Sequence, residues 1–170
     1  EQVRLAAQHK PADLTEHRLG RIAEWSQPRY RLDERFVDLS LLIDMGGDEV
    51  SGGWVIEERR FGDVRDALAE VVSPCLVVLG SPGSGKSTIL RRLELDLAID
   101  GLRDAESAAH SGQGESSATG TVTFLIQLNH YHGAAPNDAP PSPRAWLRER
   151  WAARCPDLPA IDALLAEGRV

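Results

Sequence analysis

Residues 75–90, CLVVLGSPGSGKSTIL, restrict the fold of this 170-residue chain more than any other stretch. Within them Gly80 to Ser87 match the pattern G-x-x-x-x-G-K-[ST], with an apolar run before and a helical pattern after. A continuous apolar run is typical of a strand buried on both faces of a parallel sheet. We therefore expect a buried strand, a turn, and then a helix that continues to about Gly101.

The residue types of this loop suit the binding of an anion. Glycines allow successive backbone N–H groups to point inward at the positive end of the following helix. Lys86 is one of only two lysines beside 17 arginines, and a compact ammonium fits a tight phosphate loop better than the wide fork of arginine. We expect Lys86 to reach the β- and γ-phosphates, Ser87 to bind Mg²⁺ through its hydroxyl, and Thr88 to lie near the α-phosphate. No catalytic residue is assigned; the predicted nucleotide-binding residues are Gly80, Ser81, Pro82, Gly83, Ser84, Gly85, Lys86, Ser87 and Thr88.

Composition narrows the classes of partner and compartment. The net charge is -7, the pI is near 5.2, and there is no basic run, which argues against binding to nucleic acid or to an anionic membrane. No apolar run approaches the roughly 18 residues of a membrane span, and the N-terminus has no hydrophobic signal core. Cys75 and Cys155 show neither metal-ligand spacing nor a disulfide framework. We expect a cytoplasmic protein, and a chain that begins with Glu1 is expected to be processed or excised from a longer one.

Periodicity places the remaining elements. It predicts an extended segment from Arg31, with a hairpin or an extended wrap through MGGDEVSGG to WVIEE, a flexible loop over 103–120, and a second buried strand, TVTFLIQLNH, over 121–130. Alternating strands and helices predict an α/β fold with a parallel sheet. The charged residues of the helix after the loop are expected to face solvent; they are Arg91, Arg92, Glu94 and Asp96. Helices are predicted over 13–25, 61–71, 143–154 and 160–167, the last of them stopped by Gly168.

Several of these segments resemble the first half of a NACHT domain, a branch of the STAND class of P-loop NTPases. They are VLGSPGSGKSTILRRLELDLA, TFLIQLN, the final helix with EGRV, and RYRLDERFVDLSLLI, which resembles the segment before the loop in bacterial members. The resemblance implies a three-layer αβα fold with a parallel sheet, incomplete here and preceded by an N-terminal helix and an extended segment. Residues 1–30 would be a helical lead-in and residues 31–170 the N-terminal part of the NTPase domain, truncated before the acidic Walker B residues. By the same resemblance, Phe36 and Val37 line the adenine pocket.

The resemblance also implies a function. Family members are signalling or immune switches that hold ADP when closed, exchange it for ATP after a sensor detects a ligand, and oligomerise to activate an effector. ATP or ADP with Mg²⁺ is the implied cofactor, and the implied partners are further copies and the effector or sensor domains of the full-length protein. ATP hydrolysis is expected of that protein and not of the isolated chain, which lacks Walker B.

Two other functions stay open. The loop GSPGSGKST also resembles that of nucleoside monophosphate kinases, although about 75 residues precede it here, so a small-molecule or nucleoside monophosphate kinase of the P-loop class is one alternative. The chain could also be a non-catalytic interaction module that binds nucleotide. His130 and His132 could share a metal ion, but no third ligand is in view, and the four tryptophans are expected to fill a core or an interface.

Overall fold

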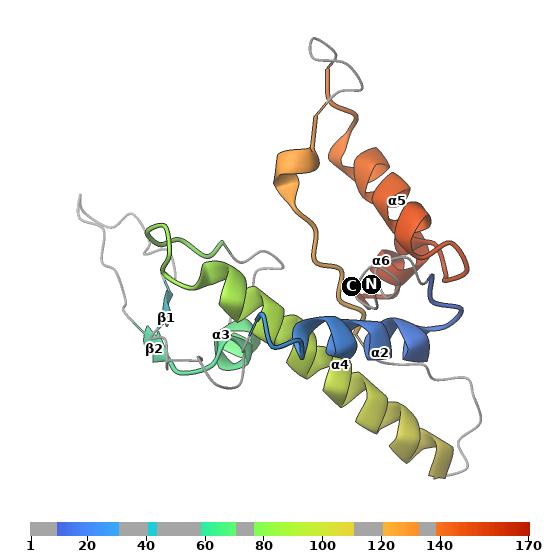
Figure 1. Cartoon of the computed structure of the whole chain (residues 1–170), viewed down its shortest axis with the longest axis horizontal. Helices are drawn as coiled ribbons and strands as arrows, with labels where there is room; N and C mark the ends of the chain where they lie inside the picture. The colour runs from blue at the N-terminus through green and yellow to red at the C-terminus, as the bar shows by residue number, and fades with distance from the viewer. Residues whose placement is uncertain (1–9, 31–40, 44–58, 71–76, 111–120, 133–138) are drawn as a thin grey trace, which may run out of the picture. The chain divides into compact units, whose positions relative to one another are not determined.

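The computed structural model in Figure 1 describes residues 10–30, 41–43, 59–70, 77–110, 121–132 and 139–170. Most of these residues are helical. They pack as two units, Glu1–Tyr30 with Glu94–Val170 and Arg31–Leu93. The elements are α2 (Leu14–Trp25), β1 (Leu41–Ile43), β2 (Arg59–Phe61), α3 (Val64–Glu70), α4 (Lys86–His110), the 3-10 helix η1 (Leu128–His130), α5 (Pro143–Arg154) and α6 (Ile161–Ala166).

Side-chain caps fix where α2 and α5 begin. The carboxylate of Asp13 accepts a 2.7 Å hydrogen bond from the backbone N–H of Glu16. Ser142 caps α5 in the same way: its hydroxyl oxygen accepts a 3.3 Å hydrogen bond from the backbone N–H of Ala145. Pro143 follows at the first helical position. A capping oxygen satisfies one of the unpaired N–H groups of a first turn, and proline there loses no helical hydrogen bond. The helices predicted over 13–25 and 143–154 are confirmed.

A left-handed glycine ends α6. Gly168 has φ 66°, and its N–H donates to the carbonyl of Leu165 at 3.1 Å. The next N–H, of Arg169, donates to Leu164 at 2.9 Å. This pair of bonds is the Schellman motif, which satisfies the last carbonyls of a helix and favours glycine. The predicted stop at Gly168 is confirmed.

The core of the first unit forms around Trp151 of α5. Its indole N–H donates to the carbonyl of Pro159 at 2.9 Å, and the ring of Phe124 meets it edge-on with centroids 5.1 Å apart. An indole buries a large apolar area provided that its N–H has an acceptor. The buried residues of this core cluster are Val122, Trp151, Cys155, Leu158, Ile161 and Leu164.

The second unit contains the one sheet of the described residues. β1 and β2 pair antiparallel, with Leu41 opposite Phe61. α3 follows and buries Val64 and Ala67, while Asp63 accepts a 2.9 Å hydrogen bond from the N–H of Arg65 in its first turn. The antiparallel pairing agrees with the predicted hairpin, but the second strand is β2. WVIEE lies outside the described residues.

The helix α4 extends further than predicted. It continues to His110, whereas we expected a loop from residue 103. Its last turns carry few large apolar residues and are largely exposed, so they give no periodic signal, yet alanine, glutamate and arginine favour a helix there. An ion pair between Arg103 and Asp100, 3.3 Å apart, spans one turn. Neither α4 nor another described helix is long and apolar enough to cross a membrane.

The predicted α/β fold with a parallel sheet, and with it the three-layer αβα arrangement, is wrong for the described part of the chain. Residues 77–80 and 121–127 form no strand pairs, and Val77 and Leu79 are 77% and 85% exposed. A continuous apolar run indicates a buried strand only if neighbouring strands cover it and pair with its backbone. The described residues supply no such neighbour.

In residues 121–127, side chains supply backbone hydrogen bonds that a neighbouring strand would otherwise provide. His17 hydrogen-bonds to the carbonyl of Thr123 at 3.1 Å through Nε2. The N–H of Leu125 donates to Glu94 at 3.3 Å, and the carbonyl of Leu125 accepts from Arg154 at 3.4 Å. An extended segment can therefore be partly buried here without joining a sheet.

A buried cation lies against α4 in the first unit. Arg18 is only 4% exposed, and its Nε and Nη2 have no hydrogen-bond partner in the described part of the chain. Burial, and then the charge of Arg169, lowers the pKa of Arg18. The guanidinium fits because residue 101 is glycine: a Cβ there would lie 2.5 Å from Nε. Gly101 is therefore needed for space and not for a turn.

We predict that the effect of Gly101→Ala depends on Arg18. With Arg18 present, the new methyl group collides with the guanidinium and lowers the free energy of unfolding. In an Arg18→Ala background the collision is gone, so the same substitution should stabilise the helix by about 1 kcal/mol, the ordinary preference for alanine over glycine. Urea unfolding of the four proteins measures this coupling.

Gly20 provides the matched control, because it lies in α2 with open space around its Cβ position. Gly20→Ala should stabilise by about the same 1 kcal/mol in both backgrounds. If Gly101→Ala stabilises the protein as much as Gly20→Ala while Arg18 is present, the proposed close packing is wrong.

Candidate functional site

The predicted phosphate loop turns into a helix, as its sequence indicates. Gly83 and Gly85 have φ values of 80° and 87°, in the left-handed region where a side chain is strained. The N–H of Ser84 donates to Ser81 at 3.2 Å and closes a turn, and the carbonyl of Gly85 accepts the first helical bonds of α4. A loop of this shape turns several backbone N–H groups toward one place.

Lys86 folds back over the loop from the first turn of α4. Its Nζ donates to the carbonyls of Gly80 and Ser81 at 2.6 and 2.8 Å, and to the hydroxyl of Ser84 at 3.4 Å. An ammonium has three donors, and all three are used. The two short bonds go to carbonyls and the long one goes to a hydroxyl, so the ammonium is held at the loop while its third contact is weak.

The remaining predicted residues lie within the same stretch. Ser81, Pro82 and Ser87 are exposed, and Thr88 is half-buried. The first turn of α4 contains no acidic side chain, so its positive end is not neutralised from within that turn. All nine predicted residues lie in the loop or in the first turn of α4. Phe36 and Val37, predicted for the adenine pocket, lie outside the described residues.

The described residues contain no group of three or more His, Cys, Asp or Glu side chains placed to hold a metal ion. His130 and His132 are both exposed. The hydroxyl of Ser87 is also exposed, at the start of α4. In a loop of this kind, Mg²⁺ takes most of its other ligands from water and the phosphates, so the position of Ser87 fits its predicted role.

His17 and Cys155 form a buried pair that no sequence pattern predicted. Nδ1 of His17 is 3.6 Å from the thiol sulfur. Because the carbonyl of Thr123 can only accept, Nε2 carries the ring hydrogen and Nδ1 accepts from the thiol. Burial lowers the pKa of His17 and raises the pKa of Cys155 to about 11. The pair is therefore neutral, unlike the thiolate and imidazolium of a catalytic dyad.

Glu94 was expected to face solvent, and this was wrong. It is 3% exposed, and its second oxygen accepts a 2.6 Å hydrogen bond from the indole N–H of Trp25. Burial raises the pKa of Glu94, and the Trp25 hydrogen bond and the charge of Arg21 oppose the rise. Glu94 links Trp25 of α2 to the backbone of Leu125 and is not a free carboxylate.

Comparison with known proteins did not extend this description. The chain matched no protein-family model, no curated protein and no solved structure.

We predict that His17 makes the protein less stable in mild acid. Its pKa in the folded state lies below the value of 6.5 expected for an unfolded chain. Above pH 6.5 both states are neutral and the full stability is present. As the pH falls below 6.5 the unfolded state takes up a proton that the folded state resists, so the free energy of unfolding falls by at most about 1.4 kcal/mol per pH unit.

Urea unfolding of the wild type and of His17→Gln between pH 7.5 and 5 tests this. The slope attributed to His17 should disappear in the variant, and subtracting the two curves removes the opposite contribution of Glu94. The exposed His130→Gln is the control and should keep the wild-type profile. If the unfolding free energies of wild type and His17→Gln change with pH in parallel, the buried imidazole is not the source of the loss of stability in mild acid.

We also predict that Cys155 is inert while the protein is folded. It is 1% exposed, and a thiol of pKa about 11 has about one part in a thousand as thiolate at pH 8. In a Cys75→Ser background, Ellman's reagent should label Cys155 only after urea is added. Labelling in native buffer at the rate of a small free thiol would contradict the burial of this pair.

Proposed function

We propose that residues 80–88 bind the phosphates of ATP or ADP, with Mg²⁺ held in part by the hydroxyl of Ser87. The observation that carries this proposal is the position of Lys86, whose ammonium is held by the carbonyls of Gly80 and Ser81. A phosphate oxygen can replace the weak 3.4 Å contact to Ser84 while both carbonyl bonds remain. The lysine needs little rearrangement to bind, which favours affinity.

Two further features support the proposal. The left-handed Gly83 and Gly85 give the loop the turn at which N–H groups converge on an anion. The first turn of α4 adds its own unpaired N–H groups and the positive end of the helix dipole. Both features favour a negatively charged ligand beside the Lys86 ammonium.

The wider role that we propose is that of a NACHT-type switch. A nucleotide can shift an equilibrium between two states only if its γ-phosphate contacts one state better, and Lys86 is the residue in this loop that would make that contact. The resemblance of the sequence supports this role, together with self-oligomerisation and effector or sensor domains as partners. The parallel sheet that the resemblance implied is no part of the proposal.

We predict that Lys86→Ala weakens binding of Mg·ATP and of ADP by about 10- to 100-fold. A hydrogen bond from an ammonium to phosphate contributes about 1.5–3 kcal/mol, and the one that replaces the Ser84 contact is lost. Calorimetry measures the affinity, and circular dichroism checks that the helices remain. Lys10→Ala removes the other lysine, which is exposed, and should bind like the wild type.

Turnover measured in the same samples separates the possible roles. Tight binding that depends on Lys86, with slow or no hydrolysis, supports a switch or a non-catalytic nucleotide-binding module. Rapid phosphoryl transfer to a nucleoside monophosphate would identify a kinase instead. Unchanged affinity in Lys86→Ala would refute the nucleotide site.

A further inference from the structure

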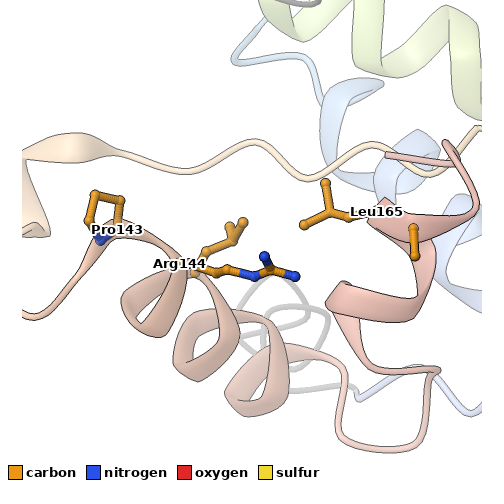
Figure 2. Close-up of a pocket in the computed structure, with 5 residues that line it drawn as sticks. Pro143, Arg144 and Leu165 are labelled. Carbon is orange, nitrogen blue, oxygen red and sulfur yellow. The ribbon is translucent and has the colours of Figure 1, made fainter.

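A groove of about 450 Å³ lies between α5 and α6 (Figure 2). Four of its five lining residues are apolar. Leu147 packs against the core cluster of the first unit, and Leu165 on α6 is 40% exposed despite its size. The groove thus has an apolar floor that is open to solvent. Its lining residues are Pro143, Arg144, Leu147, Leu165 and Ala166.

Arg144 lines the groove, and together with Arg148 and Asp162 beside it forms a rim with one excess positive charge. Arg144 donates through Nε to one oxygen of Asp162 at 2.6 Å, and Arg148 donates through Nε to the other. The two arginines are four residues apart on one face of α5, and both side chains are more than half exposed. Two guanidiniums therefore share one carboxylate, and their Nη atoms have no hydrogen-bond partner among the described residues. Figure 2 shows Arg144 extending from α5 toward α6.

We propose that this groove binds a short segment of a partner protein in which a large apolar side chain stands next to carboxylates. The apolar side chain enters the groove beside Leu165, and the carboxylates meet the free Nη donors of Arg144 and Arg148. Guanidinium and carboxylate match in shape as well as in charge. The positive rim stands out in a chain of net charge -7, so it attracts acidic groups that the rest of the surface repels.

The geometry favours a polypeptide segment over a small acid. The Nη donors that remain belong to two guanidiniums, one helical turn apart, that already share the carboxylate of Asp162, so a partner with more than one carboxylate uses them best. An open groove also leaves much of a small ligand in water, whereas small-molecule sites bury most of their ligand. A peptide adds contacts on either side. The proposal does not depend on nucleotide binding by residues 80–88.

Selection from a phage-displayed library of random 12-residue peptides on the whole immobilised chain tests the proposal. We expect enriched peptides to place Leu, Ile or Phe beside Asp or Glu. The binding of a selected peptide, measured by calorimetry, should weaken about 5- to 10-fold in the double variant Arg144→Gln with Arg148→Gln. It should also weaken in Leu165→Ser, and with added salt because the rim is exposed.

The charge-matched control is the double variant Arg103→Gln with Arg150→Gln, whose residues are exposed and lie outside the groove. It should bind the selected peptide like the wild type. Enrichment of peptides without acidic residues, equal binding to both double variants, or no enrichment would each overturn the proposal. So would binding of octanoate at the groove when no peptide binds, which would identify a small carboxylate as the ligand.

Discussion

An extended backbone segment that is partly buried without a neighbouring strand must find its hydrogen bonds elsewhere. In the first unit, side chains from three helices supply them. His17 from α2, Glu94 from α4 and Arg154 from α5 each reach a backbone group of Thr123 or Leu125. Leaving one such group unpaired in the interior costs about 1–3 kcal/mol. Three helices are therefore tied to one segment by polar contacts, around a core that is otherwise apolar.

These polar contacts bring ionisable groups inside, and burial pushes them toward their neutral forms. Burial raises the pKa of Glu94, which a hydrogen bond from Trp25 partly offsets, and it lowers the pKa of His17. The two groups thus respond to pH in opposite directions for the same physical reason. Arg18 cannot be neutralised at any ordinary pH, and it is accommodated instead by the missing side chain at Gly101.

Local signals in the sequence predicted most of the local structure, and most of the errors arose where a contact joins distant residues. Asp13 and Gly168 specify helix ends through hydrogen bonds within a few residues, so the sequence is sufficient there. The apolar run that ends at 77–80 predicts an extended segment but carries no information about what lies beside it, so the parallel sheet did not follow. His17 and Cys155 are 138 positions apart, and no spacing rule connects them. The exposed end of α4 was missed because a helix that buries nothing has no apolar period.

The loop over residues 80–88, for which we propose phosphate binding, has a structure of this local kind, so the error in the fold does not change it. The turn of the loop depends on Gly83 and Gly85. The Lys86 ammonium is held by hydrogen bonds to residues five and six positions earlier, and the helix dipole comes from the start of α4. Each of these is set within a few residues. None of them distinguishes one base from another, since they act on the phosphates alone. The phosphate affinity that we propose would therefore be a property of residues 80–88 and the first turn of α4, whereas a preference for adenine requires side chains elsewhere to contact the base.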